Sequence, residues 1–109
     1  MADQINLLVD QGTTYSVNLE VKDADGNVVN LTGFSGAGQL RKQYNSNTAT
    51  TFSVNVYSNG TVTAGLSANQ TAALTEGRYV YDIEIRNALG EVSRIVEGLI
   101  TITPEVTKV

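Results

Sequence analysis

The strongest constraint on the fold is an alternation of apolar and polar side chains with a period of two, interrupted at short intervals by turn residues. It is clearest between Gly77 and Arg86, where every second residue from Tyr79 to Ile85 is a tyrosine or an isoleucine. Successive side chains of a β-strand point to opposite faces, so a strand with this pattern buries one face and exposes the other. We therefore expect a sheet that covers a core on one side.

Similar runs recur at the spacing that is typical of sandwiches and barrels. They cover residues 5–10, 14–22, 34–44, 52–56, 61–66 and 91–103. Glycine-containing turns separate several of them, notably 23–27 and Ser58-Asn59-Gly60. Between two of the runs, Ser67 and Gln70 have the spacing of a capping box, which predicts one short helical turn.

These elements predict an all-β fold, an antiparallel two-sheet immunoglobulin-like β-sandwich of about seven to eight strands with one short helical turn. A small barrel is the alternative. The segment from Leu74 to Tyr81 has the layout of a tyrosine corner, with Tyr79 as the residue that bonds back to the preceding loop.

With 109 residues the chain has the size of one domain, 1–109. Pro104 cannot donate a hydrogen bond to a β-ladder, so the last strand is expected to end there. Glu105 to Val109 then form an extended tail.

Glycines raise two further expectations. Gly36 and Gly38 share one face of a predicted strand, which indicates close approach of another layer or another chain. In the last strand, Ile95 and Leu99 are out of step with the other apolar residues, and we expect a β-bulge near Gly98 to correct the phase.

The chain contains neither histidine nor cysteine. Thiol nucleophiles, imidazole bases and ordinary zinc sites are therefore excluded. Asp82 and Glu84 could form a catalytic carboxylate pair, but they lie between Arg78 and Arg86, and charge pairing explains them more simply. We expect no enzymatic activity and no cofactor.

Asp23, Asp25 and Asn27 are spaced like the first ligands of a calcium loop. An EF-hand needs a bidentate glutamate at the twelfth position, and that position is Phe34. A hairpin turn is the better interpretation, although calcium binding stays open. Gly36-Ala37-Gly38 lacks the lysine and the full spacing of a phosphate-binding loop.

The formal net charge of −4 is spread along the chain without a basic cluster. Nucleic-acid binding needs clustered lysine and arginine, so we expect no nucleic-acid partner. No apolar run approaches the length of a membrane span, and the amino terminus has no signal-peptide pattern, so we expect no membrane partner.

Several short motifs resemble a known class of domain. They are Asp25-Gly26-Asn27, Leu31-Thr32-Gly33 before a strand that ends in Arg41, Gly65 to Thr71, Gly77 to Ile83, and Gly98 to Thr107. Together they are similar to small immunoglobulin-like domains in virion structural proteins of tailed bacteriophages. The similarity extends over nearly the whole chain.

The resemblance implies a binding module of the virion that is assembled in the host cytoplasm. A capsid decoration or cement protein that binds the major capsid protein is the first hypothesis, supported by a chain that looks complete with its own Met1. A baseplate, neck or tail subunit is the second. A carbohydrate-binding adhesion module is a third, with Tyr44 and Tyr57 as exposed aromatics, and a homo-oligomer is also compatible.

Such a protein could bind its partners by adding a terminal strand to a neighbouring sheet. Two terminal segments are the candidates, and an ordinary edge strand and a frayed end are the alternative interpretations. The predicted partner-binding residues are Ile5, Leu7, Val9, Thr103, Glu105, Val106 and Val109.

Overall fold

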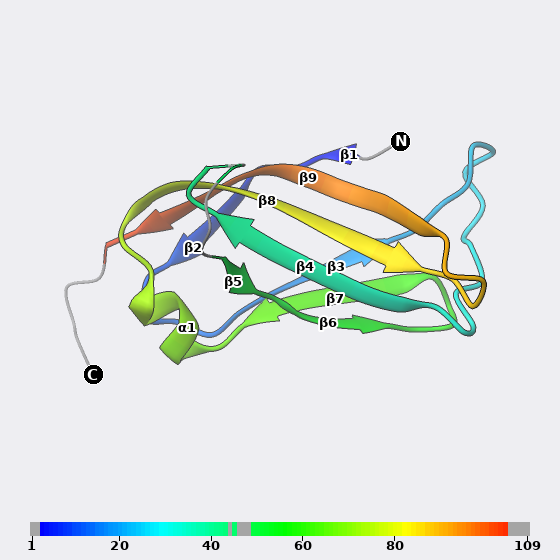
Figure 1. Ribbon diagram of the computed structural model, residues 1–109, viewed down its shortest axis with the longest axis horizontal. Helices are drawn as coiled ribbons and strands as arrows, with labels where there is room; N and C mark the ends of the chain where they lie inside the picture. The colour runs from blue at the N-terminus through cyan, green and yellow to red at the C-terminus, as the bar shows by residue number, and fades with distance from the viewer. Residues whose placement is uncertain (1–2, 44, 46–48, 105–109) are drawn as a thin grey trace.

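The alternating runs form two β-sheets in the computed structural model, which describes residues 3–43, 45 and 49–104 (Figure 1). The larger sheet contains β1 (Asp3–Gln4), β2 (Leu7–Asp10), β4 (Ser35–Arg41), β5 (Thr50–Thr51), β8 (Gly77–Arg86) and β9 (Val92–Thr103). The smaller sheet contains β3 (Tyr15–Glu20), β6 (Ser53–Val56) and β7 (Thr61–Leu66). One helix, α1 (Ala68–Ala73), connects β7 to β8. Among the described residues, no helix has the length and apolar character needed to cross a bilayer.

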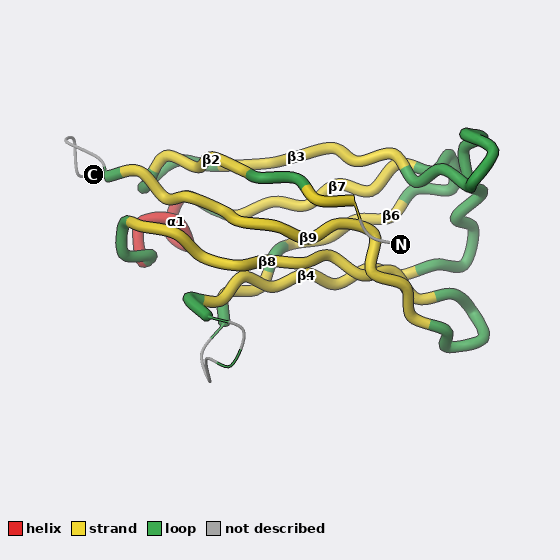
Figure 2. Tube along the Cα trace, turned by 90° about the horizontal axis from the view of Figure 1, so that it is seen from above, coloured by secondary structure: helices red, strands yellow, loops and turns green. Residues whose placement is uncertain are grey.

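The strands run along the longest dimension of the molecule, which measures 44 Å (Figures 1 and 2). The connections 21–34, 57–60 and 87–91 gather at one end, on the right of Figure 1, and we call this the loop end. The helix α1 lies at the opposite end. Loops collected at the two ends are typical of β-sandwiches, because each connection joins strands that span the full length.

The order of pairing confirms the immunoglobulin-like sandwich. The larger sheet has the order β5-β4-β8-β9, and the smaller has β3-β7-β6. These orders are those of immunoglobulin strands C′-C-F-G and B-E-D. Pairing is antiparallel as expected, with one exception: β1 and β2 run parallel to β9.

The core lies between the inner faces of the two sheets, where the alternation of the sequence placed it. On β8 the tyrosines and isoleucines at alternate positions are buried, and Ile83 is 0% exposed. On β7 the facing residues are equally buried. The main core residues of these two strands are Tyr79, Tyr81, Ile83, Ile85, Val62, Ala64 and Leu66.

Gly36 and Gly38 of β4 allow close approach of the second layer, as the sequence predicts. A Cβ atom on Gly36 would lie 2.5 Å from Cγ1 of Val54 and 2.9 Å from Cγ2 of Val56. At Gly38 it would lie 3.2 Å from Cδ2 of Phe52. The approaching layer is therefore β6 and the residue before it in the same chain.

Two local motifs form as the sequence predicts. Ser67 and Gln70 make the reciprocal hydrogen bonds of a capping box at the start of α1, with distances of 3.1 Å and 2.9 Å. The hydroxyl of Tyr79 donates to the carbonyl oxygen of Thr75 at 2.7 Å, which forms the tyrosine corner. These bonds fix the crossover from the smaller sheet to the larger one.

The predicted position of the bulge is wrong. The register between β8 and β9 shifts between Ile83 and Glu84, whose partners are Val96 and Arg94, so Ile95 is the extra residue. The shift lets Ile95 pack partly against the core. Gly98 lies within the regular part of the ladder, opposite Tyr81, and has a different role.

We predict that Gly36→Ala lowers the free energy of unfolding by about 1–3 kcal/mol, because the added methyl group overpacks the contact with Val54. Urea unfolding monitored by circular dichroism measures the change. Val54→Ala makes room for the methyl group, so the double variant should lose less stability than the sum of the two single variants. Simple additivity would contradict the proposed contact.

Candidate functional site

The predicted partner-binding strand near the amino terminus is already paired within the chain. Leu7 pairs with Ile100 and Val9 with Ile102 as β2 runs parallel to β9. Val9 is 0% exposed and belongs to the core, so its side chain is not on the surface where the partner-binding prediction requires it. Leu7 packs against the core with a partly buried side chain. The inward direction of these two residues follows from the shared register with β9.

A small cluster of contacts fixes the break between β1 and β2. The buried hydroxyl of Tyr81 donates to the carbonyl oxygen of Ile5 at 2.6 Å. The side-chain oxygen of Asn6 accepts from the backbone N–H of Leu99 at 3.2 Å. At Gly98, a Cβ atom would collide with the carbonyl group of Ile5, which explains the glycine. We call these residues the amino-terminal clamp.

The other predicted partner residues fall into two groups. Ile5 is 37% exposed, and the hydroxyl of Thr103 donates to the carboxylate of Asp10 at 2.7 Å. Ile5 precedes β2 on the surface, and Thr103 is a half-buried residue of β9 that pairs with Asp10 at the end of β2. Glu105, Val106 and Val109 lie outside the described residues, as does Tyr44.

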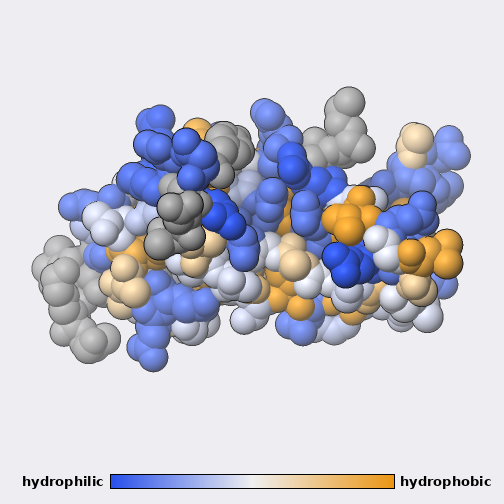
Figure 3. All heavy atoms as spheres, viewed as in Figure 1, coloured by the Kyte–Doolittle hydropathy of each residue, from blue (hydrophilic) through white to orange (hydrophobic). Residues whose placement is uncertain are grey.

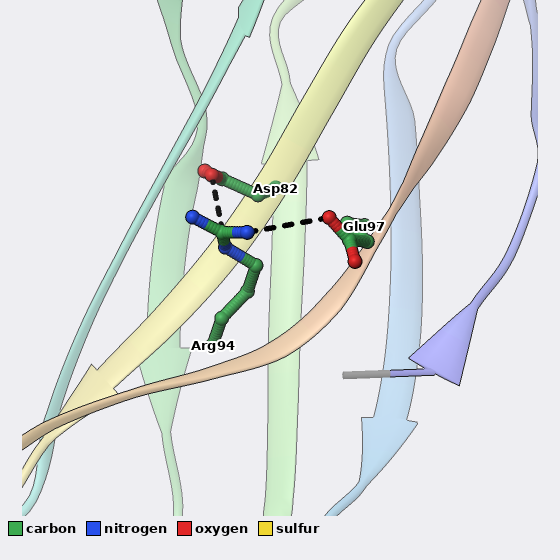
Figure 4. Close-up of polar contacts among 3 residues, drawn as sticks. All are labelled: Asp82, Arg94 and Glu97. Atoms are coloured by element: carbon green, nitrogen blue, oxygen red, sulfur yellow. Dashed lines mark hydrogen bonds and ion pairs between the residues drawn. The ribbon is translucent and has the colours of Figure 1, made fainter. Parts of the chain in front are cut away.

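Asp82 and Glu84, the carboxylates considered as a catalytic pair, alternate with the buried residues of β8 and so lie on the outer face of the larger sheet. Figure 4 shows the surroundings of Asp82. Asp82 forms an ion pair with Arg94 of β9 at 3.4 Å, and the same guanidinium lies 3.3 Å from Glu97. Charge pairing is thus confirmed for Asp82, but its partner is Arg94, since the register shift at Ile95 brings Arg94 near Asp82. All three side chains are 29–49% exposed, and such surface pairs contribute little stability.

This cluster surrounds a shallow hollow with a volume of about 320 Å³. The hollow is lined by Gln39, Arg41, Val80, Tyr81, Asp82, Glu84, Arg94 and Glu97. Its chemistry is that of mixed, solvent-exposed charge. The side chains that line the hollow can form hydrogen bonds and ion pairs with a partner surface.

The acidic turn considered as a calcium loop has the geometry of an Asx turn. One carboxylate oxygen of Asp23 accepts from the backbone N–H groups of Asp25 and Asn27, each at 3.0 Å. Gly26 has a φ of 84°, which this turn requires. Within the described residues, no three acidic, histidine or cysteine side chains are grouped as metal ligands would be.

Large apolar side chains are exposed at the loop end (Figure 3). Leu89, at the tip of the β8–β9 hairpin, is 86% exposed. The loop-end residues are Val28, Tyr57, Leu89 and Val92. Sequence reasoning expected Tyr57 to be exposed, but it placed Val92 in the last strand and Leu89 in a turn. A leucine inside the turn Asn87-Ala88-Leu89-Gly90 is a signal that could have identified the site.

A second group of exposed apolar residues lies on the outer face beside the clamp. Leu8 is 65% exposed and Leu99 is 38% exposed. Leu8 pairs with Thr101, so Leu99 is its diagonal neighbour on the same face. We call this pair the β9 strip.

A groove of about 600 Å³ opens between β3 and β9 near the loop end. Its walls come from both sheets and combine apolar with polar and charged residues in about equal share. Leu19, Val21, Phe34, Ile85 and Ile95 line the apolar part. The groove follows the side of the sandwich where β3 has no neighbouring strand among the described residues.

Comparisons with known proteins identify no family. No family model matches the chain, and no curated protein sequence matches it significantly. Among solved structures, the internalin-like protein lmo2027 of Listeria monocytogenes is similar over 94% of this chain, with 13% identity and a TM-score of 0.48. The chain spans 28% of the length of that protein. At this level of similarity the match carries no argument about function.

The amino-terminal clamp yields one prediction. Gly98→Ala should displace the Ile5 carbonyl group and weaken the pairing of β2 with β9. Hydrogen–deuterium exchange should then be at least tenfold faster in residues 7–10, while the β3–β7 pair keeps its protection. Gly90→Ala is the glycine control, because it places a side chain at a positive φ of 86° in the distant β8–β9 hairpin, where a Cβ atom meets no neighbour within 4 Å. Unchanged exchange in residues 7–10 would show that the clamp does not hold the strand.

The same clamp predicts a dependence on alkaline pH. Burial, with a smaller contribution from Tyr15, raises the pKa of Tyr81 from 10.0 to about 12. The folded state therefore holds this proton more tightly than the unfolded state does. The resulting stability is fully present below pH 10 and is lost as the pH rises from 10 to about 12.

We expect Tyr81→Phe to flatten the fall of the unfolding free energy across this pH range. Urea unfolding at a series of pH values measures the slope. Tyr57→Phe is the control, because Tyr57 is 49% exposed at the loop end. Parallel slopes for the two variants would contradict the role assigned to the Tyr81 hydroxyl.

Proposed function

We propose that this protein is a non-enzymatic structural component of a tailed-phage virion, and more specifically a capsid decoration protein. In this role it binds the major capsid protein at the surface of the head and stabilises the contacts between neighbouring capsid subunits. Two lines of reasoning support the proposal. The first is the resemblance of the sequence motifs to virion immunoglobulin-like domains, and the second is the chemistry of the loop end.

The loop-end residues are the observation on which the proposal depends most. Leu89 is 86% exposed, and Val28, Tyr57 and Val92 are 47–49% exposed. A folded domain gains little by exposing large apolar side chains, and exposed patches of this kind are typical of protein contacts. Tyr57 and Leu89 lie in connections between paired strands, and Val92 begins β9, so the sandwich positions these side chains, as it often does binding residues.

A decoration role makes use of this geometry. Binding through one end leaves the long sides of the sandwich free. A leucine at the tip of a hairpin can enter a pocket on a flat partner surface, where the central apolar contacts usually contribute most of the affinity. Burial of that contact across two capsid subunits would oppose their separation.

Cosedimentation with purified particles tests the proposal. The protein should bind saturably to heads that lack it, should raise the temperature at which they disrupt, and should not bind to tails. Leu89→Ser combined with Tyr57→Ser should weaken binding to heads at least tenfold, because two apolar contacts are lost. Equilibrium binding of a fluorescently labelled protein gives the dissociation constants.

The matched control removes two exposed apolar side chains elsewhere, by Leu8→Ser combined with Leu99→Ser in the β9 strip. This variant should bind heads like the wild type. If it loses binding while the loop-end variant keeps it, the contact lies beside the predicted residues Ile5 and Leu7. Binding only to tails would assign the protein to a baseplate, neck or tail. Binding to glycans but to neither particle would replace the proposal with an adhesion module that uses Tyr57.

A further inference from the structure

The smaller sheet ends in an open strand edge at β3. In immunoglobulin constant-type sheets, strand A pairs with strand B, and β3 occupies the position of strand B. Here the amino-terminal strands β1 and β2 pair with β9 instead. Among the described residues, β3 pairs with β7 alone, so every second residue of β3 directs its backbone N–H and C=O groups away from the sheet.

The side chains of β3 show the effect of the missing neighbour. Tyr15, Val17 and Leu19 point inward but are only partly buried. Their partners on β7 are Leu66, Ala64 and Val62, which are at most 2% exposed. A strand added at the edge of β3 would therefore cover apolar surface as well as unpaired backbone groups.

No device that usually protects an edge is present on β3. Its six residues pair with β7 in continuous register without a bulge, and the strand contains neither proline nor lysine. Glu20, at its last position, is its one charged residue. By contrast, the outer strand of the larger sheet, β5, has two residues.

The sequence of β3 is complementary to itself. In an antiparallel pair centred on Val17, Tyr15 lies opposite Leu19 on the inner face. On the outer face Ser16 lies opposite Asn18. No like charges oppose one another, and a shift of the centre to Asn18 keeps apolar residues opposite apolar ones and places Glu20 opposite Ser16.

We propose that β3 pairs with β3 of a second copy of this chain across a twofold axis, which joins the two smaller sheets into one continuous sheet. Such an interface is isologous, and each copy presents the same edge. The dimer requires no other protein, so this inference goes beyond the proposed role on the phage head. Its test uses the purified chain alone.

Analytical ultracentrifugation across a dilution series tests the dimer. The wild type should reach a mass of twice 11.6 kDa at high concentration. Ser16→Lys combined with Asn18→Lys places ammonium groups opposite one another across the axis. We expect this variant to raise the dissociation constant of the dimer about tenfold or more.

A matched control exists on the other edge of the same sheet. Ser53 and Asn55 of β6 are also exposed and also two positions apart. Ser53→Lys combined with Asn55→Lys adds the same charge to the same residue types, and should leave the dimer intact. Equal melting temperatures of the two lysine variants, measured at a concentration at which both are monomeric, would show that the edge, and not the fold, is affected.

Charge complementation completes the test. Ser16→Glu combined with Asn18→Glu should also be monomeric, and an equimolar mixture with the β3 lysine variant should form a heterodimer. Recovery of the dimer in the mixture supports pairing through β3. A wild type that stays monomeric at every concentration overturns the proposal, and so does a dimer that the β3 variants leave unchanged while the β6 variant disrupts it.

Discussion

The burial of one face of β8 against the smaller sheet is the interaction on which the rest of the structure depends. Ile83 at the centre of that face is fully buried, and Tyr79 and Tyr81 extend it toward the helix end. The neighbouring strands β4 and β9 both pair with β8. The glycines of β4 then allow β6 to approach closely, so the sandwich narrows beside its central strand.

The two tyrosines of β8 also connect the core to the periphery. Both bury their rings among apolar residues and direct their hydroxyl groups to backbone carbonyls, of Thr75 and of Ile5. Buried tyrosines usually need such a partner for the hydroxyl group. One strand therefore positions both the crossover after α1 and the amino-terminal segment.

The elements with strong local patterns were predictable from the sequence. Three elements form as expected: the strand from Gly77 to Arg86, the β6–β7 hairpin that turns at 58–60, and the capping box at Ser67. Each depends on interactions between residues that are close in the sequence. The glycine at 98 was misread, because a glycine within a strand has two explanations, a bulge or a close backbone contact. A glycine is required at position 98 because the carbonyl group of Ile5 lies against it, and Ile5 is far away in the sequence.

The surface features were less predictable for the same reason. The pairing of Asp82 with Arg94 depends on a register shift that the out-of-step apolar residues indicate but do not place at Ile95. Val9 appeared as an accessible edge residue, whereas its parallel pairing with β9 places it in the core. The open edge of β3 can be recognised only when the pairing of all strands is known.

The parallel pairing of β2 with β9 has a consequence for how the chain folds. It joins residues 7–10 to residues 100–103, so an early strand of this domain has its partner in the strand that is synthesised after all the others described here. Until β9 has been synthesised, the early strand lacks the partner it has in the folded domain. Contacts between residues so distant in sequence form slowly. Completion of the sandwich is therefore expected to be a late event that depends on the whole chain, and nascent chains that stop before β9 should remain exposed to proteases and chaperones.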